Sequence, residues 1–154
     1  MQNRYNALEV IEMAKDIEKR GYEFYTNQAK ISKNKDLKEL FLKLAKDEKD
    51  HYQRFIEISN IISEQTKKEA EYVYDPEVSA YLQSIVEFSV FPADETVKIE
   101  DIKEALQLAI YAEKDSILFY QEMLAHNDGQ TSLIIEKLIK EEKQHLLELV
   151  NYHV

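Results

Sequence analysis

The sequence has no cysteine and only two glycines and two prolines among its 154 residues. Without cysteine, the chain can form no disulfide, no thiolate metal site and no iron–sulfur cluster held by its own sulfur. Because glycine and proline interrupt helices, their scarcity predicts long helices. The formal net charge of −10 argues against nucleic acid or an anionic membrane surface as a partner, since both are negatively charged.

Long apolar runs are also missing from the sequence. No run approaches the ~20 residues that a membrane-spanning helix needs, and Met1–Glu9 lacks the pattern of a signal peptide. We therefore expect a cytoplasmic protein with no membrane partner. A chain of this length suits a single domain over residues 1–154 that buries a substantial core.

Two stretches of the sequence share one pattern, KDEKDHYQRF and KEEKQHLLEL. Glu48 stands three residues before His51 in the first stretch, and Glu142 stands three residues before His145 in the second. On an α-helix, this spacing puts a carboxylate and an imidazole on one face, where both can bind the same metal ion. A given histidine has a glutamate at that spacing by chance roughly one time in seven. Two copies in matched surroundings therefore favour a metal site.

Each motif follows a second segment that is also repeated. The stretches AKDIEKRGYEFY and AIYAEKDSILFY align so that Glu18 matches Glu113 and Tyr25 matches Tyr120. The number of residues between the two Glu-x-x-His motifs is almost the same as the number between these two stretches. The sequence therefore contains a duplicated helical hairpin. Glu18 and Glu113 each interrupt an apolar stripe, where an unpaired carboxylate costs several kcal/mol or takes up a proton. Either a cation compensates each carboxylate, or its head group reaches solvent.

Capping signals and periodicity predict four long helices with a long connection in the middle. Asp47 and Asp50 fall off the apolar stripe of the second helix and are expected to be solvated. The connection contains a short amphipathic helix, and its aromatic residues Tyr72, Tyr74, Phe88 and Phe91 are expected to pack on the bundle or on a second subunit. The predicted helices span about residues 7–32, 36–66, 101–126 and 131–150, the connection spans 67–100, and its short helix spans about 78–89.

One inward glutamate on each of two helices and a Glu-x-x-His motif on each of the other two form the ligand set of ferritin-like bundles that hold two metal ions. On these motifs the chain resembles rubrerythrins over nearly its whole length. The resemblance implies an all-α, ferritin-like four-helix bundle made of two duplicated helical hairpins joined by a long crossover with a short helix. It also implies that Glu48 and Glu142 bridge the two metals, that Glu18 and His51 complete one ion, and that Glu113 and His145 complete the other.

The charge of such a site would balance. Two divalent ions bring four positive charges, and the four ligand glutamates bring four negative ones, so the cluster can be buried. Mixed carboxylate and imidazole ligands suit two iron ions, cycling between Fe²⁺ and Fe³⁺, or manganese better than structural zinc. Zinc remains an alternative occupant.

Four further residues are candidates for the surroundings of the ligands. Tyr25 and Tyr120 each follow a ligand glutamate by two helical turns, so they either hydrogen-bond a carboxylate on another helix or are ordinary core tyrosines. Gly21 and Ser116 occupy equivalent positions of the two hairpins, one turn after that glutamate. Small residues at these positions either leave a path for peroxide or O₂ to the metals or reflect close helix packing.

Rubrerythrins reduce hydrogen peroxide at a di-iron centre, so the resemblance implies an oxidoreductase that reduces hydrogen peroxide or O₂. Longer rubrerythrins have a rubredoxin domain in which four cysteines hold an iron that supplies electrons. This sequence has no cysteine, so an external electron donor such as rubredoxin is expected. Ser116 stands where rubrerythrins have an additional glutamate. This chain therefore lacks the residue whose ligand exchange is thought to serve peroxide turnover.

Two alternatives remain at the level of sequence. Within the same fold, the chain can be a ferroxidase or another iron-handling protein. In a different class, it can be a non-catalytic metal-binding or interaction module that keeps the ligands for stability alone. A homodimer is expected for any of these.

Overall fold

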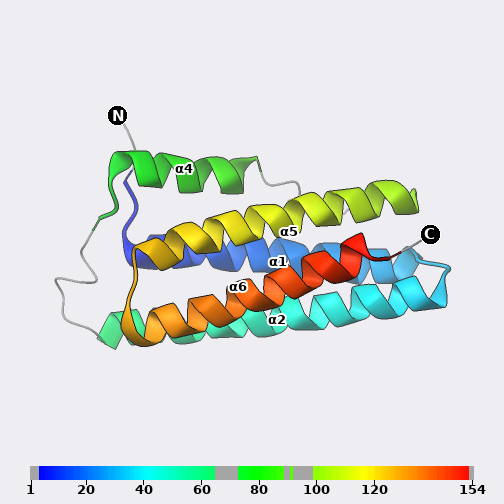
Figure 1. Ribbon diagram of the computed structural model, residues 1–154, viewed down its shortest axis with the longest axis horizontal. Helices are drawn as coiled ribbons and strands as arrows, with labels where there is room; N and C mark the ends of the chain where they lie inside the picture. Colours follow the sequence, from blue (N-terminus) through cyan, green and yellow to red (C-terminus); the bar gives the residue numbers. More distant parts are fainter. Residues whose placement is uncertain (1–3, 65–72, 89–90, 92–98, 153–154) are drawn as a thin grey trace.

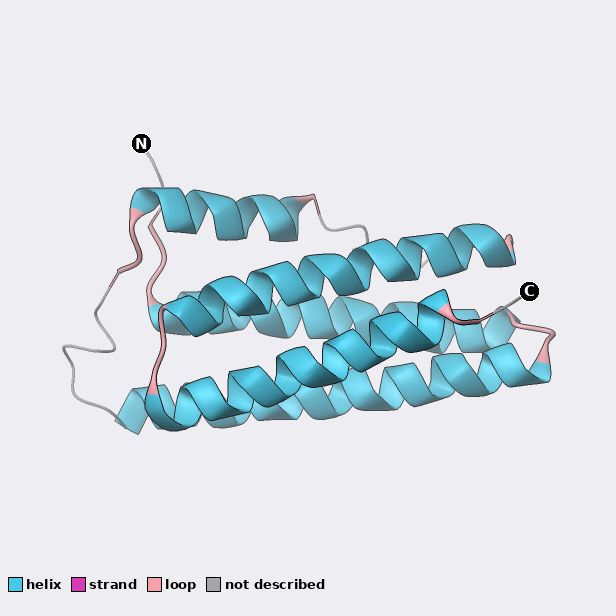
Figure 2. Cartoon of the chain, viewed as in Figure 1, coloured by secondary structure: helices cyan, strands magenta, loops and turns pink. Residues whose placement is uncertain are grey.

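The structure is a computed structural model that describes residues 4–64, 73–88, 91 and 99–152. Four long helices lie side by side and a shorter helix lies along the outside of the bundle (Figure 1). No strand is present in the described part of the chain (Figure 2). In chain order the helices are α1 (Ala7–Ile31), α2 (Lys35–Glu64), α4 (Pro76–Glu87), α5 (Ile102–Ala125) and α6 (Gly129–Val150). The all-α fold class predicted from the sequence is confirmed.

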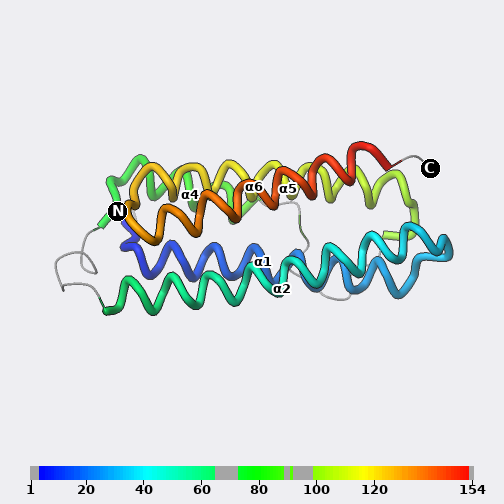
Figure 3. The backbone as a smooth tube through the Cα atoms, turned by 60° about the horizontal axis from the view of Figure 1, so that its bottom comes forward, coloured from blue at the N-terminus to red at the C-terminus, as the bar shows by residue number. Residues whose placement is uncertain are grey.

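The helices pair as two hairpins. Helices α1 and α2 pack along each other, as do α5 and α6, and the hairpins meet through α1 against α5 and α2 against α6. Helix α2 ends at one end of the bundle and α5 begins at the other, so the connection between the hairpins runs the length of the bundle (Figure 3). This is the long crossover expected from the sequence, and it makes α5 antiparallel to α1.

Local signals set the helix starts. Asn6 and Glu9 form a capping box, in which the Glu9 N–H donates to Asn6 Oδ1 at 2.9 Å and the Asn6 N–H donates to Glu9 Oε1 at 3.3 Å. Asp101 accepts from the Glu104 N–H at 3.0 Å in the same way. Gly129 begins α6 with a φ of 57°, a conformation that glycine adopts without strain. The ends predicted near residues 66 and 89 lie outside the described residues.

Helix α4 is held to the start of α1. The Tyr5 N–H donates to Ser79 Oγ at 3.1 Å, and the Tyr74 N–H donates to the Tyr5 carbonyl at 2.8 Å. Tyr74 and Phe91 are buried, as expected for aromatic residues of the connection, whereas Phe88 is 76% exposed. Phe88 lies just past the end of α4 and does not pack on its own bundle, so for this residue only the alternative of packing on a second subunit stays a prediction. Tyr72 lies outside the described residues.

The core consists of two apolar clusters separated by a polar layer. One cluster joins the first half of α1 to the second half of α2, around residues such as Ile11 and Phe55. The other joins the second half of α1 to the first half of α2, around Tyr25 and Phe41. Between the clusters, every long helix contributes buried glutamate or histidine side chains. Within the described residues, no helix has both the length and the apolarity of a membrane span.

Candidate metal centre

The polar layer contains all six residues that the sequence suggested as metal ligands. They come from four different helices, and each is at most 2% exposed. Their oxygen and nitrogen atoms form two groups, in each of which the candidate ligand atoms lie within 4.8 Å of one another. The first group is Glu18, Glu48, His51 and Glu142, and the second is Glu48, Glu113, Glu142 and His145. Two of the glutamates, Glu48 and Glu142, belong to both groups.

The two histidines direct the same ring nitrogen toward the carboxylates. Nδ1 of His51 lies 2.8 Å from Glu142 Oε1 and 3.6 Å from Glu18 Oε2. Nδ1 of His145 lies 3.1 Å from Glu48 Oε1. The two imidazole rings are stacked with centroids 5.5 Å apart. Each motif therefore presents one nitrogen to carboxylates of other helices, as two adjacent metal ions would require.

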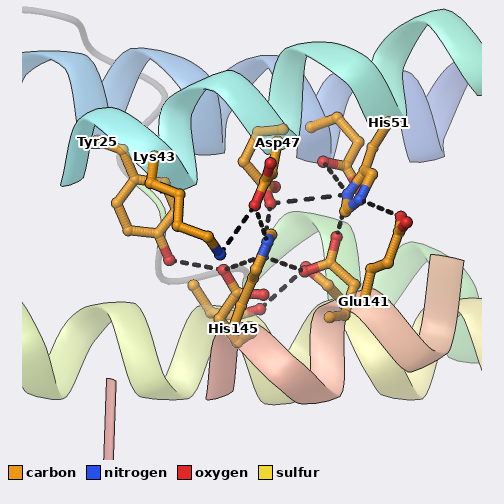
Figure 4. A network of polar contacts seen from close by, with 12 residues as sticks. Tyr25, Lys43, Asp47, His51, Glu141 and His145 are labelled. Atoms are coloured by element: carbon orange, nitrogen blue, oxygen red, sulfur yellow. Dashed lines mark hydrogen bonds and ion pairs between the residues drawn. The ribbon is translucent and has the colours of Figure 1, made fainter. Parts of the chain in front are cut away.

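The other ring nitrogen of each histidine faces an outer carboxylate (Figure 4). His145 Nε2 lies 3.0 Å from Asp47 Oδ2, and His51 Nε2 lies 2.9 Å from Glu141 Oε2. A histidine that donates its Nε2–H to such a carboxylate keeps its ring oriented and leaves Nδ1 for a metal. The expectation that Asp47 is solvated is only partly right, because its side chain is 35% exposed but the histidine of the opposite hairpin also reaches it.

Glu141 was missed by the sequence reasoning, although a signal for it exists. Asp47 and Glu141 occupy matched positions of the duplication, each directly before the motif glutamate. Each acid bonds the histidine of the other motif, so the two contacts join α2 to α6. An acidic residue at that position in both copies was therefore a pattern available from the sequence.

Each outer acid is also paired with a cation. Lys43 Nζ lies 3.2 Å from Asp47, and Arg54 lies 3.4 Å from Glu141. The hydrogen bond from His145, and then the contact with Lys43, lower the pKa of Asp47 to about 2, although partial burial acts in the opposite direction. A cleft of about 150 Å³ opens beside them. The cleft is lined by Lys43, Asp47, Asp50, His51, Glu141, Gln144 and His145.

The two repeated tyrosines bond the two glutamates that are not shared between the ligand groups. The Tyr25 hydroxyl donates to Glu113 Oε1 at 2.6 Å, and the Tyr120 hydroxyl donates to Glu18 Oε1. Each bond crosses between the two hairpins. Tyr25 of α1 reaches the glutamate of α5, and Tyr120 of α5 reaches the glutamate of α1. Burial, and then the charge of the bonded glutamate, raise the pKa of both hydroxyls well above 10.0. Both tyrosines therefore remain hydrogen-bond donors at neutral pH.

The two small residues lie in different surroundings. A Cβ added at Gly21 would meet Glu48 Oε2 at 2.9 Å and a ring carbon of Phe91 at 3.2 Å. The absence of a side chain at Gly21 therefore makes room for a shared ligand, and the space beside it is filled. Ser116 is buried, and its hydroxyl donates to the Ala112 carbonyl at 3.0 Å. Its proton is thus used within its own helix.

The two shared glutamates favour their protonated form when no metal is bound. Burial, and then the charge of Glu142, raise the pKa of Glu48 well above 4.5. Burial, and then the charge of Glu113, likewise raise the pKa of Glu142. Burial also acts to raise the pKa of Glu18, but the charge of His51 and polar contacts with Glu48, His51 and Glu142 together lower that pKa to about 2. Burial also acts to raise the pKa of Glu113, but contacts with Glu142, His145 and Tyr25 together lower it. Two of the carboxylates thus favour the protonated form and two favour the ionised form.

The surrounding carboxylates favour the doubly protonated form of both histidines when no metal is bound. Burial acts to lower the pKa of His51, but the charge of Glu18 and a hydrogen bond with Glu142 raise it to about 12. Burial acts in the same way on His145, but its hydrogen bond with Asp47 and its close approach to the glutamates raise its pKa well above 6.5. Two imidazolium groups then balance two carboxylates. Two divalent ions restore the same neutrality when they replace four protons.

The residues present fit a pair of metal ions. Several buried ligand atoms have no hydrogen-bond partner in the structure, which costs about 1–3 kcal/mol for each atom. These atoms are Glu18 Oε2, both carboxylate oxygens of Glu48, Glu113 Oε2, Glu142 Oε2 and His145 Nδ1. One metal ion held by each of the two ligand groups would satisfy them, and the mixture of oxygen and nitrogen donors suits iron or manganese.

These pKa shifts predict that rising pH lowers the stability of the metal-free fold and increases the stabilisation that metal binding adds. Groups with a raised pKa, such as Glu48 and His51, stabilise the metal-free fold at low pH, and this contribution is lost as pH rises through the folded pKa. The metal-free protein should therefore melt at a lower temperature as pH rises from about 5 to about 8. Mn²⁺ should raise the melting temperature most at the upper end, because fewer protons compete for the ligands. Calorimetry measures both trends, and equal melting temperatures with and without metal would contradict them.

The outer acids generate a second prediction. Asp47→Ala or Glu141→Ala should weaken binding of one of two Mn²⁺ ions by about 10–100-fold, because one histidine loses the acceptor that orients it. Glu57→Ala is the matched control, since Glu57 is an exposed acid of α2 outside the cleft. Competition with a chelating indicator measures the affinities. If the control loses as much affinity as the two variants, the orienting role is wrong.

The comparisons with known proteins agree with the geometry. A family model described as rubrerythrin matches residues 9–151. A crystal structure from Thermotoga maritima, described as that of a ferritin-like diiron-carboxylate protein, superposes with a TM-score of 0.72 and 23% sequence identity. That similarity covers 97% of this chain and 95% of the other, and it concerns the fold. No curated protein matches the sequence. Because the family match spans most of its length, the chain belongs to the rubrerythrin family.

Proposed function

We propose that the protein is a di-iron oxidoreductase that reduces hydrogen peroxide or O₂ with electrons from a separate donor. The observation that supports this most directly is the pair of ligand groups that share Glu48 and Glu142. Shared carboxylates hold two ions next to each other, which a site for one structural ion does not need. When bound, two iron ions supply the two electrons that convert hydrogen peroxide and two protons into two molecules of water.

The chain's own residues give such a site its environment. Apolar clusters on both sides of the polar layer exclude bulk water, which strengthens electrostatic interactions inside it. Tyr25 and Tyr120 hold Glu113 and Glu18 by hydrogen bonds, which keeps these carboxylates oriented. The cleft beside the two histidines has a volume of about 150 Å³, enough for a small oxidant.

The electron donor is inferred from composition. The 154 residues contain no cysteine, so they hold no thiolate-bound iron that relays electrons to the centre. We therefore infer a separate redox protein, with rubredoxin as the first candidate.

A ferroxidase or iron-handling role is the second candidate, and the cleft favours it. Asp47, Asp50 and Glu141 line the cleft directly outside the two histidines. These three acids outnumber Lys43 and Arg54, the two cations paired with them, so a net negative charge at the mouth would attract Fe²⁺. In that role, iron would be oxidised and passed on rather than reduced again at the same site.

Stopped-flow absorbance separates these functions. The Fe²⁺-loaded protein should be oxidised faster by hydrogen peroxide than by O₂, and rubredoxin with NADH and a reductase should restore the reduced spectrum. Glu48→Gln or Glu142→Gln should slow oxidation at least about tenfold, because a bridging charge is lost. Glu122→Gln is the control, since Glu122 contacts the surface residue His126 on the same helix.

The other outcomes are equally definite. Faster oxidation by O₂, with Fe³⁺ that the donor does not reduce, would favour the ferroxidase. No absorbance change with either oxidant would contradict both catalytic functions and favour a metal-binding module.

A further inference from the structure

The outer faces of the two hairpins differ, although the hairpins are repeats of each other. Figure 1 shows α5 and α6 as a layer in front of α1 and α2, and helix α4 packs on α5 and α1 but not on α6. The outward face of the α5–α6 layer carries large apolar side chains that are 45–67% exposed. They are Tyr111 and Leu118 on α5 and Leu133 and Leu147 on α6.

Helical spacing places these side chains in two rows. Tyr111 and Leu118 are seven residues apart, which is about two turns of α5. Leu133 and Leu147 are fourteen residues apart, which is about four turns of α6. Each pair therefore lies along one side of its helix, and the two rows run beside each other because α5 and α6 pack along their length.

The first hairpin serves as an internal comparison for these positions. The repeat that pairs the ligand glutamates of the two hairpins also pairs each exposed apolar residue with a polar one. Asp16 matches Tyr111, Glu23 matches Leu118, Glu39 matches Leu133 and Gln53 matches Leu147. The reverse exchange occurs at Leu42, which is exposed and matches Glu136. Single exposed leucines are common, but an apolar residue at four matched positions of one face indicates that this face is covered.

The first hairpin also shows that the matched positions share one face. Glu23 of α1 and Gln53 of α2 line the same groove between these helices. Asp16 lines a second groove, which shares Lys19 and Tyr52 with the first. By the repeat, the exposed apolar residues lie together on the corresponding face of α5 and α6.

Charge has been lost from the second hairpin at these positions. Besides the metal ligand Glu18, six charged residues line the two grooves of the first hairpin, namely Glu12, Lys15, Asp16, Lys19, Glu23 and Lys49. Of their matches in the second hairpin, only Lys114 and Lys143 are charged. Lys114 Nζ lies 6.0 Å from the centroid of the Tyr111 ring, so this cation packs on an aromatic residue of the same face. The face is thus less suited to water than its repeat.

The size of this face suits a second copy of the chain. Helix α5 has 24 residues and α6 has 22, so each is about 35 Å long. Two adjacent helices give a face roughly 20 Å wide. Two such faces in contact would bury on the order of 1,400 Å² in total, which is the size of a specific interface. A two-fold dimer uses the same face of both subunits and leaves neither exposed.

The charges of the face also permit a second copy to bind. The formal net charge of the chain is −10, so two copies repel each other through most of their surfaces. On this face, however, Lys114, Lys140 and Lys143 accompany Glu104 and Glu136, and all five are exposed. Two copies can therefore meet here without bringing two acidic surfaces together.

We propose that the protein forms a two-fold dimer through the outward face of α5 and α6. The row of Tyr111 and Leu118 and the row of Leu133 and Leu147 form the apolar centre of the interface. The ligands Glu113 and Glu142 of these helices are buried on their inward side, so each subunit keeps a complete metal site.

Sedimentation velocity tests the proposal directly. At about 10–100 μM the wild type should sediment as a particle of twice the 18.2 kDa chain mass. The triple variant Tyr111→Asp, Leu118→Glu and Leu147→Gln installs the residues of the first hairpin. It should raise the dissociation constant at least about 100-fold, because polar groups replace apolar contacts and must lose their water on binding. Circular dichroism should show unchanged helix content, since all three positions are exposed.

Leu42→Glu is the matched control, because it replaces an exposed leucine of the first hairpin by an acid. This variant should remain a dimer. A monomeric wild type at about 100 μM, or a dimer that the triple variant leaves intact, would overturn the proposal. Loss of the dimer in Leu42→Glu would also overturn it, because the interface would then involve the first hairpin.

Spin labels give a second readout that does not depend on how the triple variant folds. The chain has no cysteine of its own, so a single introduced cysteine carries the label. Two labels at Gln107→Cys of α5 should lie closer to each other across the dimer than two labels at Gln53→Cys of α2, and both positions are exposed. Pulsed electron paramagnetic resonance measures these distances, and the reverse order would contradict the proposal. None of these results depends on iron, so failure here is distinguishable from failure of the proposed redox function.

Discussion

Charge balance within one buried layer is the constraint on which the rest of the structure depends. Four carboxylates and two imidazoles interrupt the apolar core at the middle of the bundle. Such a layer is stable only if protons or metal ions neutralise it. The raised pKa values of Glu48, Glu142 and His51 favour neutralisation by protons when no metal is bound. A pair of divalent ions meets it equally well and also satisfies the ligand atoms that lack partners.

The duplication explains how one layer holds both hairpins together. His145 reaches Asp47 of the first hairpin, and His51 reaches Glu141 of the second. The tyrosines also join the two hairpins, since Tyr25 bonds the glutamate of α5 and Tyr120 bonds the glutamate of α1. Each repeat therefore orients the ligands of the other. A single hairpin would have half of the ligands and none of these supports.

Much of this arrangement is predictable from the sequence because helical periodicity is a local property. The spacing of Glu48 and His51, repeated in the second hairpin, is enough to place both side chains on an inward face. Periodicity assigns Asp47 to solvent because it shows only which face of α2 this residue occupies. It contains no information about a histidine that reaches Asp47 from a neighbouring helix. The aromatic character of Phe88 predicts packing, but its position beyond α4 leaves it exposed.

The most direct test of the account is the number and position of metal ions in the protein. Anaerobic loading with Fe²⁺, followed by crystallography with anomalous scattering at the iron edge, should show two sites, one beside His51 and one beside His145, with Glu48 and Glu142 between them. His51→Ala should lose mainly the ion on its own side, while His126→Ala, at an exposed position, should keep both. A wild-type protein that holds only a trace of iron after loading, or iron bound elsewhere, would contradict the account.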